Sequence, residues 1–322
     1  MSTTQKFSQM GLAILIFVAV IGAMLLLASR FSGRRADPLV AGLFLLPTVL
    51  LLGIGLLYPA IRTVYESFFN AAGDAFSGLD NYQKIFTDHD ELIVLRNTFL
   101  WVVITPFIAT VVGLIYAILV DKARFEKIAK ALIFLPMAIS FVGASIIWKF
   151  VYEYRPEQGS IKQIGLLNQV LVWLGGSPQQ WLLEKPWNNL FLIAILIWIQ
   201  AGFAMTILSA AIRGIPEDIV EAARLDGVGA LGMFRFVTVP SIRPTLVVVL
   251  TTIAIATLKV FDIVRVVTGG QFDTSVIANE FYTQSFSAAN QGLGAALAVV
   301  LFVLVIPIVV YNVRQLRASE GR

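Results

Sequence analysis

The sequence predicts an all-α membrane protein, a polytopic bundle of about seven transmembrane helices. Hydrophobic residues make up 58% of its 322 residues and charged residues only 14%, and the mean hydropathy is +0.83. A typical soluble domain carries about 25% charged residues. Apolar runs of roughly 20 residues recur along the chain, and no alternation with a period of two marks a strand. Because only helices and closed barrels satisfy their backbone groups in lipid, we expect these runs to be helices.

Seven runs are long enough to cross a hydrocarbon core about 30 Å thick. They cover residues 10–28, 39–60, 97–120, 131–151, 188–211, 245–267 and 292–311. The first run can also be read as a signal peptide. We favour a retained anchor, because residues 29–36 are rich in arginine and lack a small-residue cleavage site.

The positions of Lys and Arg between the runs predict the orientation of the chain. Fourteen of these residues fall in one set of connections and seven in the other. Since cytoplasmic loops retain positive charge, the richer set is predicted to be cytoplasmic. Trp101, Trp148 and Trp187 then fall at external helix ends, where tryptophan is favoured. We therefore expect an external N-terminus and a cytoplasmic C-terminus.

The composition disfavours most hydrolytic and redox chemistry. The chain has no cysteine and one histidine, His89, so neither a thiolate nucleophile nor a histidine-rich metal centre is expected. Its acidic residues are scattered, whereas a membrane-embedded enzyme needs clustered carboxylates or a nucleophile. No Gly-Lys pair is present to form a phosphate-binding loop. We expect no catalytic residue, no metal, no cofactor bound by this chain and no nucleic-acid partner.

The chain is expected to divide into four segments. Residues 1–38 form a membrane anchor with its cytoplasmic connection, and residues 39–96 form the second span with an external loop. Residues 97–311 form a five-helix core, and residues 312–322 form a cytoplasmic tail. Within the core, residues 152–187 have interspersed Gly, Pro, Leu and Trp, which indicate a folded external cap. This cap is either a docking surface or plain packing over the helix ends.

The cytoplasmic segment 212–244 contains a short helix. Pro216, Glu217 and Asp218 are typical of a helix start, and Gly227 can adopt the left-handed conformation that ends one. Residues 216–226 span about 16 Å, which is too short to cross a membrane. A second helical piece is expected to follow, before Pro240 and Pro244 break the chain at the next span.

This segment carries a specific resemblance. Glu221-Ala222-Ala223-Arg224-Leu225-Asp226-Gly227, followed by Phe234, Pro240 and Pro244, resembles the cytoplasmic loop signature of permease subunits in bacterial binding-protein-dependent ABC importers. Further matching motifs are Asn97-Thr98, Leu135-Pro136, Trp148-Lys149, Gly165-Leu166-Leu167-Asn168, Gly202-Phe203, Phe261-Asp262 and Thr268-Gly269-Gly270. Together they resemble the first permease of maltose-type sugar importers over residues 97–311. After Gly270 the maltose-type permeases usually continue with a further glycine and a proline, whereas this chain has Gln271-Phe272-Asp273. This departure is similar to the α-glucoside branch. The exact sugar is left open.

The resemblance implies a permease in the bacterial inner membrane that imports an oligosaccharide, an α-glucoside such as maltose or trehalose. The implied partners are a second permease, two ATPase subunits that bind ATP and Mg, and an external sugar-binding protein. The short helix would transmit the motion of the ATPase, through Glu221, Ala222, Ala223, Arg224, Asp226 and Gly227. Its alternative interpretation is a capped surface connection. The alternative function is a stand-alone secondary transporter or channel, for which ion-coupling residues and an internal repeat are not evident.

Polar residues within the spans are candidates for the substrate pathway. Lys259, Asp262 and Arg265 are spaced by three residues, so we expect them on one helical face, where Asp262 can pair with either cation. They form either a polar lining of the pathway or an ion-paired packing element. Sugars need hydrogen-bonding groups and aromatic faces, and Gln200 with Trp198 is the best such pair. Asn279, Tyr282 and Gln284 either contribute near the external mouth or support the loop.

Overall fold

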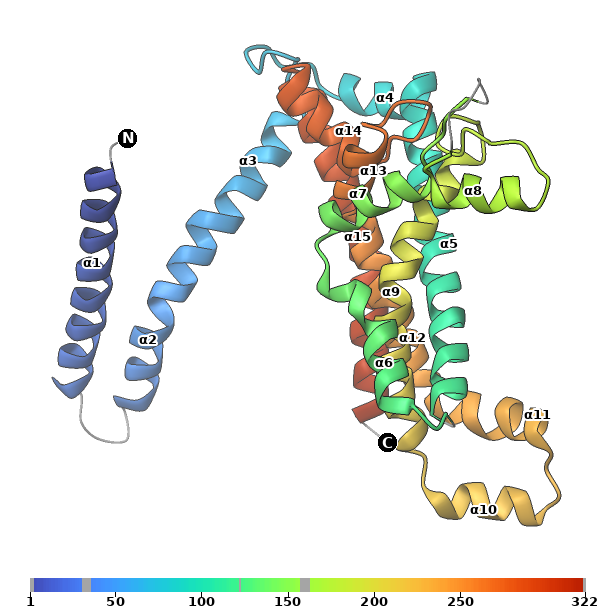
Figure 1. Ribbon diagram of the computed structural model, residues 1–322. Helices are drawn as coiled ribbons and strands as arrows, with labels where there is room; N and C mark the ends of the chain where they lie inside the picture. Colours follow the sequence, from blue (N-terminus) through green and yellow to red (C-terminus); the bar gives the residue numbers. More distant parts are fainter. Residues whose placement is uncertain (1–2, 31–35, 122, 157–162, 321–322) are drawn as a thin grey trace. The chain divides into compact units, whose positions relative to one another are not determined.

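The computed structural model describes residues 3–30, 36–121, 123–156 and 163–320. These residues form helices, with one isolated β-bridge between Phe69 and Phe76, so the predicted all-α class is confirmed. Parts of the predicted segments 1–38, 152–187 and 312–322 lie outside the described residues. The chain divides into two compact units, Met1–Tyr65 and Glu66–Arg322, and Figure 1 labels their helices.

The first unit consists of long apolar helices. α1 covers Thr3–Arg30, α2 covers Ala36–Leu52, and a π-helical segment Gly53–Leu57 leads into α3, Tyr58–Glu66. Ser8–Leu26 and Val40–Glu66 are each long and apolar enough to cross a membrane. Their apolar side chains are exposed all round, as expected for helices that face lipid.

The second unit contains the helical bundle shown in Figure 1. α5 lies along α9, α12 lies against both, and α15 lies against α12. The remaining helices are shorter, and α6 lies alongside α9. The helices of this unit are α4 Asp80–Thr87, α5 His89–Val120, α6 Glu126–Phe134, α7 Phe141–Val151, α8 Leu166–Trp173, α9 Asn188–Arg213, α10 Glu217–Leu225, α11 Ala230–Gly232, α12 Val239–Leu258, α13 Asp262–Val267, α14 Ile277–Tyr282 and α15 Gln291–Glu320.

α5 and α9 run in the same direction. At their beginnings, Asn97 and Asn189 both donate side-chain hydrogen bonds to the Asp273 carbonyl, at 2.7 Å and 3.0 Å. At their ends, Asp121 and Arg213 form an ion pair of 3.2 Å. Between these points the helices approach so closely that a Cβ on Gly113 would lie 2.4 Å from the Ala204 Cβ. The bundle therefore has two distinct ends, one at the start of α5 and one where α9 leads into α10.

The predicted span at residues 131–151 is bent. α6 and the 3₁₀ turn Leu135–Ala138 meet α7 at 103°. Pro136 cannot donate a backbone hydrogen bond, and Ser140 caps α7 by accepting from the Gly143 amide at 3.1 Å. A Cβ on Gly202 of α9 would lie 2.4 Å from the Ile133 carbonyl, so glycine permits the close approach. Counting this bent pair as one span, seven candidate spans are present in the described residues, in agreement with the predicted number.

The expected break at Pro240 and Pro244 is wrong. α11 continues through a π-helical segment, Met233–Thr238, into α12, and Ala230–Leu258 is one candidate span. Pro240 lies at the first turn of α12, next to the wider π-helical turns. In a π-helical turn the backbone hydrogen bonds join residues five apart instead of four. The hydrogen-bond pattern therefore changes next to Pro240, which has no N–H to donate. The span expected at residues 245–267 therefore begins earlier and ends at Leu258.

Candidate coupling surface and transport pathway

α10 is short but firmly ended. Glu217 and Asp218 occupy its first turn, where acidic side chains favour the positive end of the helix dipole. At the other end, Val228 N–H donates to the Ala223 carbonyl at 3.1 Å and Gly227 N–H to the Arg224 carbonyl at 3.0 Å. Gly227 has a φ of +76°. These two bonds and the left-handed glycine are those of a Schellman motif, so the helix end predicted at Gly227 is confirmed.

One face of α10 is exposed and carries two kinds of side chain. Asp218, Glu221, Ala222 and Leu225 are exposed and follow the spacing that places residues on one helical face. Leu225 is 89% exposed. An exposed leucine beside two carboxylates is typical of a surface that receives a partner, because contacts of this kind have an apolar centre and a polar edge.

The other face of α10 lies against the start of the long α11–α12 helix. A cavity of about 420 Å³ separates them, and Val220, Arg224, Met233 and Phe234 are among the residues that line it. α10 also contacts the π-helical segment directly.

The predicted coupling residues differ in position. Glu221 and Ala222 lie on the exposed face, and Ala223 is half-buried. Arg224 is exposed but also lines the cavity behind the helix. Asp226 is the C-cap residue. Leu225 belongs to the motif at residues 221–227, but it was not among the predicted coupling residues. An apolar residue four positions after Glu221, on a helix too short to cross a membrane, was the available signal.

An ion-pair network joins the ends of three helices beside this cavity. The Asp121 carboxylate, after α5, pairs with Lys130 of α6 at 2.6 Å and with Arg213 of α9 at 3.2 Å. Ser209 donates to the same carboxylate at 2.8 Å, and Glu126 pairs with both Lys130 and Arg213. In the sequence these cations contribute only to the cytoplasmic excess of positive charge. The network itself was not predicted, because Ser209 and Arg213 of α9 lie more than 80 residues after Asp121.

Asp121 is ionised in this network. Burial raises the pKa of its carboxyl group, but hydrogen bonds from Lys130, Ser209 and Arg213 outweigh burial and hold the pKa below its ordinary value of 3.8. Hydrogen bonding and nearby positive charge both favour the charged form. The network is therefore a fixed, charged tie between α5, α6 and α9 at neutral pH.

The expected helical face of Lys259, Asp262 and Arg265 is wrong. α12 ends at Leu258 with Lys259 as its C-cap, and Asp262 starts the separate α13. Among the described residues, no ion pair joins Asp262 to either cation. Periodicity assumes one continuous helix, and the turn at residues 259–261 interrupts it.

Two of the predicted cations lie among aromatic rings instead. The Arg265 guanidinium lies 4.7 Å from the ring centre of Tyr282, and Phe261 packs on the same ring at 5.0 Å. Lys259, Phe261 and Tyr282 line a cavity of about 350 Å³ where the turn after α12 meets α14 and α15. The structure thus brings Lys259, Arg265 and Tyr282 together in an aromatic, cationic group.

Trp198 and Gln200 do not form the expected pair. Both lie in α9, where residues two apart point about 200° away from each other. Trp198 packs edge-on against Trp148, with 5.7 Å between ring centres, and belongs to a largely buried apolar cluster. Gln200 is buried on another side of α9.

Asn279 supports the loop between α13 and α14. It is buried and donates to the Ser275 hydroxyl at 2.9 Å, and a Cβ on Gly270 would lie 2.3 Å from its amide nitrogen. This matches the loop-supporting role that the sequence left open. Gln284 donates to the Glu280 carboxylate at 2.8 Å.

Three further asparagines hold the same loop, and no role was predicted for them from the sequence. Asn97 and Asn189 bind the Asp273 carbonyl, and Asn188 donates to the Phe272 carbonyl at 2.7 Å. Phe272 and Asp273 both have a φ of +58°, which is unfavourable for residues with a Cβ. The side-chain amides stabilise this conformation, so the start of α5 and of α9 is fixed to the loop.

The comparison with protein families decides what kind of protein this is. Residues 109–317 match the family described as "Binding-protein-dependent transport system inner membrane component". The chain belongs to this family. It is an ABC importer permease, a transport component of the inner membrane, as its loop signature predicted.

Known permeases resemble the chain over most of its length. The permease is 50% identical over 278 residues to the osmoprotective compounds uptake permease protein GgtC of Synechocystis sp., covering 86% of this chain and 99% of the relative. It is 48% identical over 289 residues to the alpha-glucoside transport system permease protein AglF of Rhizobium meliloti, covering 89% and 85%.

A solved structure shows the same fold. The permease matches a chain in the crystal structure of a bacterial ABC transporter involved in the import of the acidic polysaccharide alginate, with a TM-score of 0.74. The match covers 88% of this chain and 96% of that chain, at 23% identity. At this identity the likeness concerns the fold alone.

Proposed function

We propose that this permease imports an oligosaccharide, an α-glucoside such as maltose or trehalose, with ATP hydrolysis on separate subunits. The name of the alpha-glucoside permease at 48% identity supports this substrate class. The exposed face of α10 supports the coupling role, because a stiff, capped helix seated on α12 can transmit the motion of a docked protein.

We propose different partners for the two ends of the bundle. We infer that α10 faces the cytoplasm and two ATPase subunits that bind ATP and Mg, with the C-terminus on the same side and the N-terminus outside. The excess of Lys and Arg at this end supports that orientation. A sugar-binding protein approaches the opposite end, and a second permease completes the pathway, whose core we assign to residues 97–311.

The substrate pathway is proposed along the outer half of the bundle. Lys259 and Tyr282 line one cavity, and the Arg265 guanidinium lies over the Tyr282 ring. Together they offer cationic donors and an aromatic face, and Asp262 starts the adjacent helix. Gln200 offers a separate hydrogen-bonding group on α9. Trp198 and Asn279 support these positions by packing and by holding the loop.

Uptake by the reconstituted complex tests the proposal. The complex in liposomes, supplied with its binding protein and ATP, should accumulate labelled maltose or trehalose. A panel that also includes osmoprotective compounds other than α-glucosides tests the second substrate class, which the name of the 50% identical relative supports. Uptake restricted to osmoprotectants that are not α-glucosides would contradict the α-glucoside assignment.

A variant of the exposed face tests coupling separately. Leu225→Asp places a charge at the centre of the proposed contact and should abolish uptake and sugar-stimulated ATP hydrolysis, while the subunits still insert in the membrane. Leu231→Asp is the matched control, since Leu231 is 79% exposed nearby but lies on α11, outside α10. Equal losses in both variants would contradict a specific role for Leu225.

A further inference from the structure

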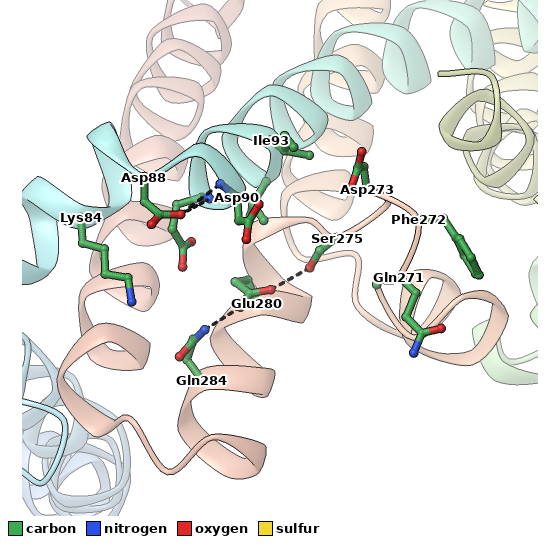
Figure 2. Close-up of a pocket in the computed structure, with 13 residues that line it drawn as sticks. Lys84, Asp88, Asp90, Ile93, Gln271, Phe272, Asp273, Ser275, Glu280 and Gln284 are labelled. Atoms are coloured by element: carbon green, nitrogen blue, oxygen red, sulfur yellow. Dashed lines mark hydrogen bonds between the residues drawn. The ribbon is translucent and has the colours of Figure 1, made fainter. Parts of the chain in front are cut away.

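A cavity of about 430 Å³ lies at the end of the bundle opposite α10. It forms where α4, the first turns of α5, the loop after α13 and α14 meet, as Figure 2 shows. Its lining contains five carboxylates and one cation, namely Asp88, Asp90, Glu91, Asp273, Glu280 and Lys84. The cavity is therefore strongly acidic.

Two of the five carboxylates have charged or helix-capping partners. Asp88 caps α5 by accepting from the Asp90 and Glu91 amides. Asp273 pairs with Lys185 at 2.5 Å. The negative charges of Asp90, Glu91 and Glu280 have no such partner among the described contacts.

Glu91 is the group that points to a ligand. Its side chain is only 4% exposed, and its Oε2 atom has no hydrogen-bond partner. Glu280 accepts from Ser275 at 3.0 Å and from Gln284 at 2.8 Å, both neutral donors. A buried carboxylate without a partner is costly, and a cation that enters the cavity would remove that cost.

The size and donor arrangement favour an organic cation over a metal ion. No group of three metal-ligating side chains converges in the described part of the chain. The cavity also exceeds the roughly 30 Å³ of a single water many times over. A guanidinium group offers five donors in a plane, which match carboxylates at separate positions.

We propose that this cavity receives an arginine or lysine side chain of the external sugar-binding protein when that protein docks. The inference rests on the proposed function, which places this end of the bundle outside the membrane. A neutral sugar does not need five carboxylates, whereas a protein surface that presents a basic side chain matches them in charge. The loop of Phe272 and Asp273 lines the cavity, so docking there also contacts the loop that holds the starts of α5 and α9.

Titration of the binding protein against the complete transporter in lipid nanodiscs tests the proposal. Glu91→Gln and Asp90→Asn keep the side-chain shape and remove a charge. In both variants the Kd for the sugar-loaded binding protein should rise, by roughly 30-fold when the buried Glu91 is changed. Asp90 is exposed, so its variant remains informative if Glu91→Gln fails to assemble.

Asp80→Asn is the matched control. Asp80 is an exposed carboxylate on α4 that does not line the cavity, so its loss should leave the Kd unchanged. Unchanged Kd values in both cavity variants would overturn the proposal, as would a Kd in the unmodified complex that depends on Ca²⁺ or EDTA. If the unmodified complex responds to the loaded binding protein and the variants bind equally well, only the docking inference fails. If it responds to no loaded binding protein, the proposed function fails.

Discussion

Gly227 ends α10 in a conformation that few residues with a side chain adopt. Its φ is +76°, and a Cβ there would meet no atom within 4 Å. A substitution therefore acts through the backbone alone and not through a clash. The left-handed conformation costs an L-residue about 1–2 kcal/mol, more when the side chain is β-branched, and asparagine tolerates it best.

Replacement of Gly227 by valine should uncouple transport. The cost to the helix end lowers the ratio of capped to uncapped α10 by about 5- to 30-fold. We expect sugar uptake and stimulated ATP hydrolysis to fall, by at most this factor, while membrane insertion is retained. Gly227→Asn is the control and should keep most of the activity. Wild-type uptake by the valine variant would show that this helix end does not limit coupling.

α10 is the element that the sequence predicted best. Its bounds and its terminating glycine are set by residues within one short segment, and local rules suffice for such features. The end of α12 at Leu258 was missed for the opposite reason. No glycine or proline marks residues 258–261, so the turn there depends on how α13 packs against α7 and α9.

The proline-containing elements show the same limit. Pro240 and Pro136 carry equal local signals, yet Pro136 lies in a 3₁₀ turn at a sharp bend and Pro240 lies within a continuous helical span. The difference lies in the neighbours, because Gly202 admits the bent backbone beside α6. Sequence spacing alone does not reveal such a contact between elements.

The ion-pair network that ties α5, α6 and α9 predicts a pH dependence of stability. The folded-state pKa of Asp121 is depressed, so between the folded and unfolded pKa values the unfolded chain binds more protons. The stabilisation is complete well above the unfolded pKa of 3.8 and is lost as the pH falls below it, through the folded pKa.

Asp121→Asn should therefore lower the free energy of unfolding by about 1–3 kcal/mol near neutral pH. The difference from the unmodified protein should narrow as the pH falls below 3.8, because protonation then removes the same charge from Asp121. Thermal unfolding of both proteins in detergent across this pH range measures the difference in stability. Glu184→Gln, at an exposed carboxylate, should show no such difference. A constant difference at every pH would mean that the Asp121 charge does not stabilise the fold.

At the scale of the whole molecule, the sequence predicted how many spans there are and missed how their polar residues meet. Hydrophobic runs measure only length and apolarity, which suffices for the span count. The asparagine contacts with the loop of Phe272 and Asp273 join residues more than 80 positions apart. Such contacts follow from the parallel course of α5 and α9, which no local pattern encodes.

At the scale of the assembly, the proposed function predicts that the chain alone does not drive uphill transport. α10 exposes a contact face, and the sequence contains no Gly-Lys pair for a phosphate-binding loop, so we propose that energy enters through a separate subunit. We expect the purified permease in liposomes to accumulate no sugar, with or without an ion gradient, and the assembled complex to accumulate it with ATP inside. Fluorescent detection of trapped sugar compares the two preparations. Accumulation by the permease alone under a proton or sodium gradient would support a secondary transporter, because only ion coupling could then supply the work.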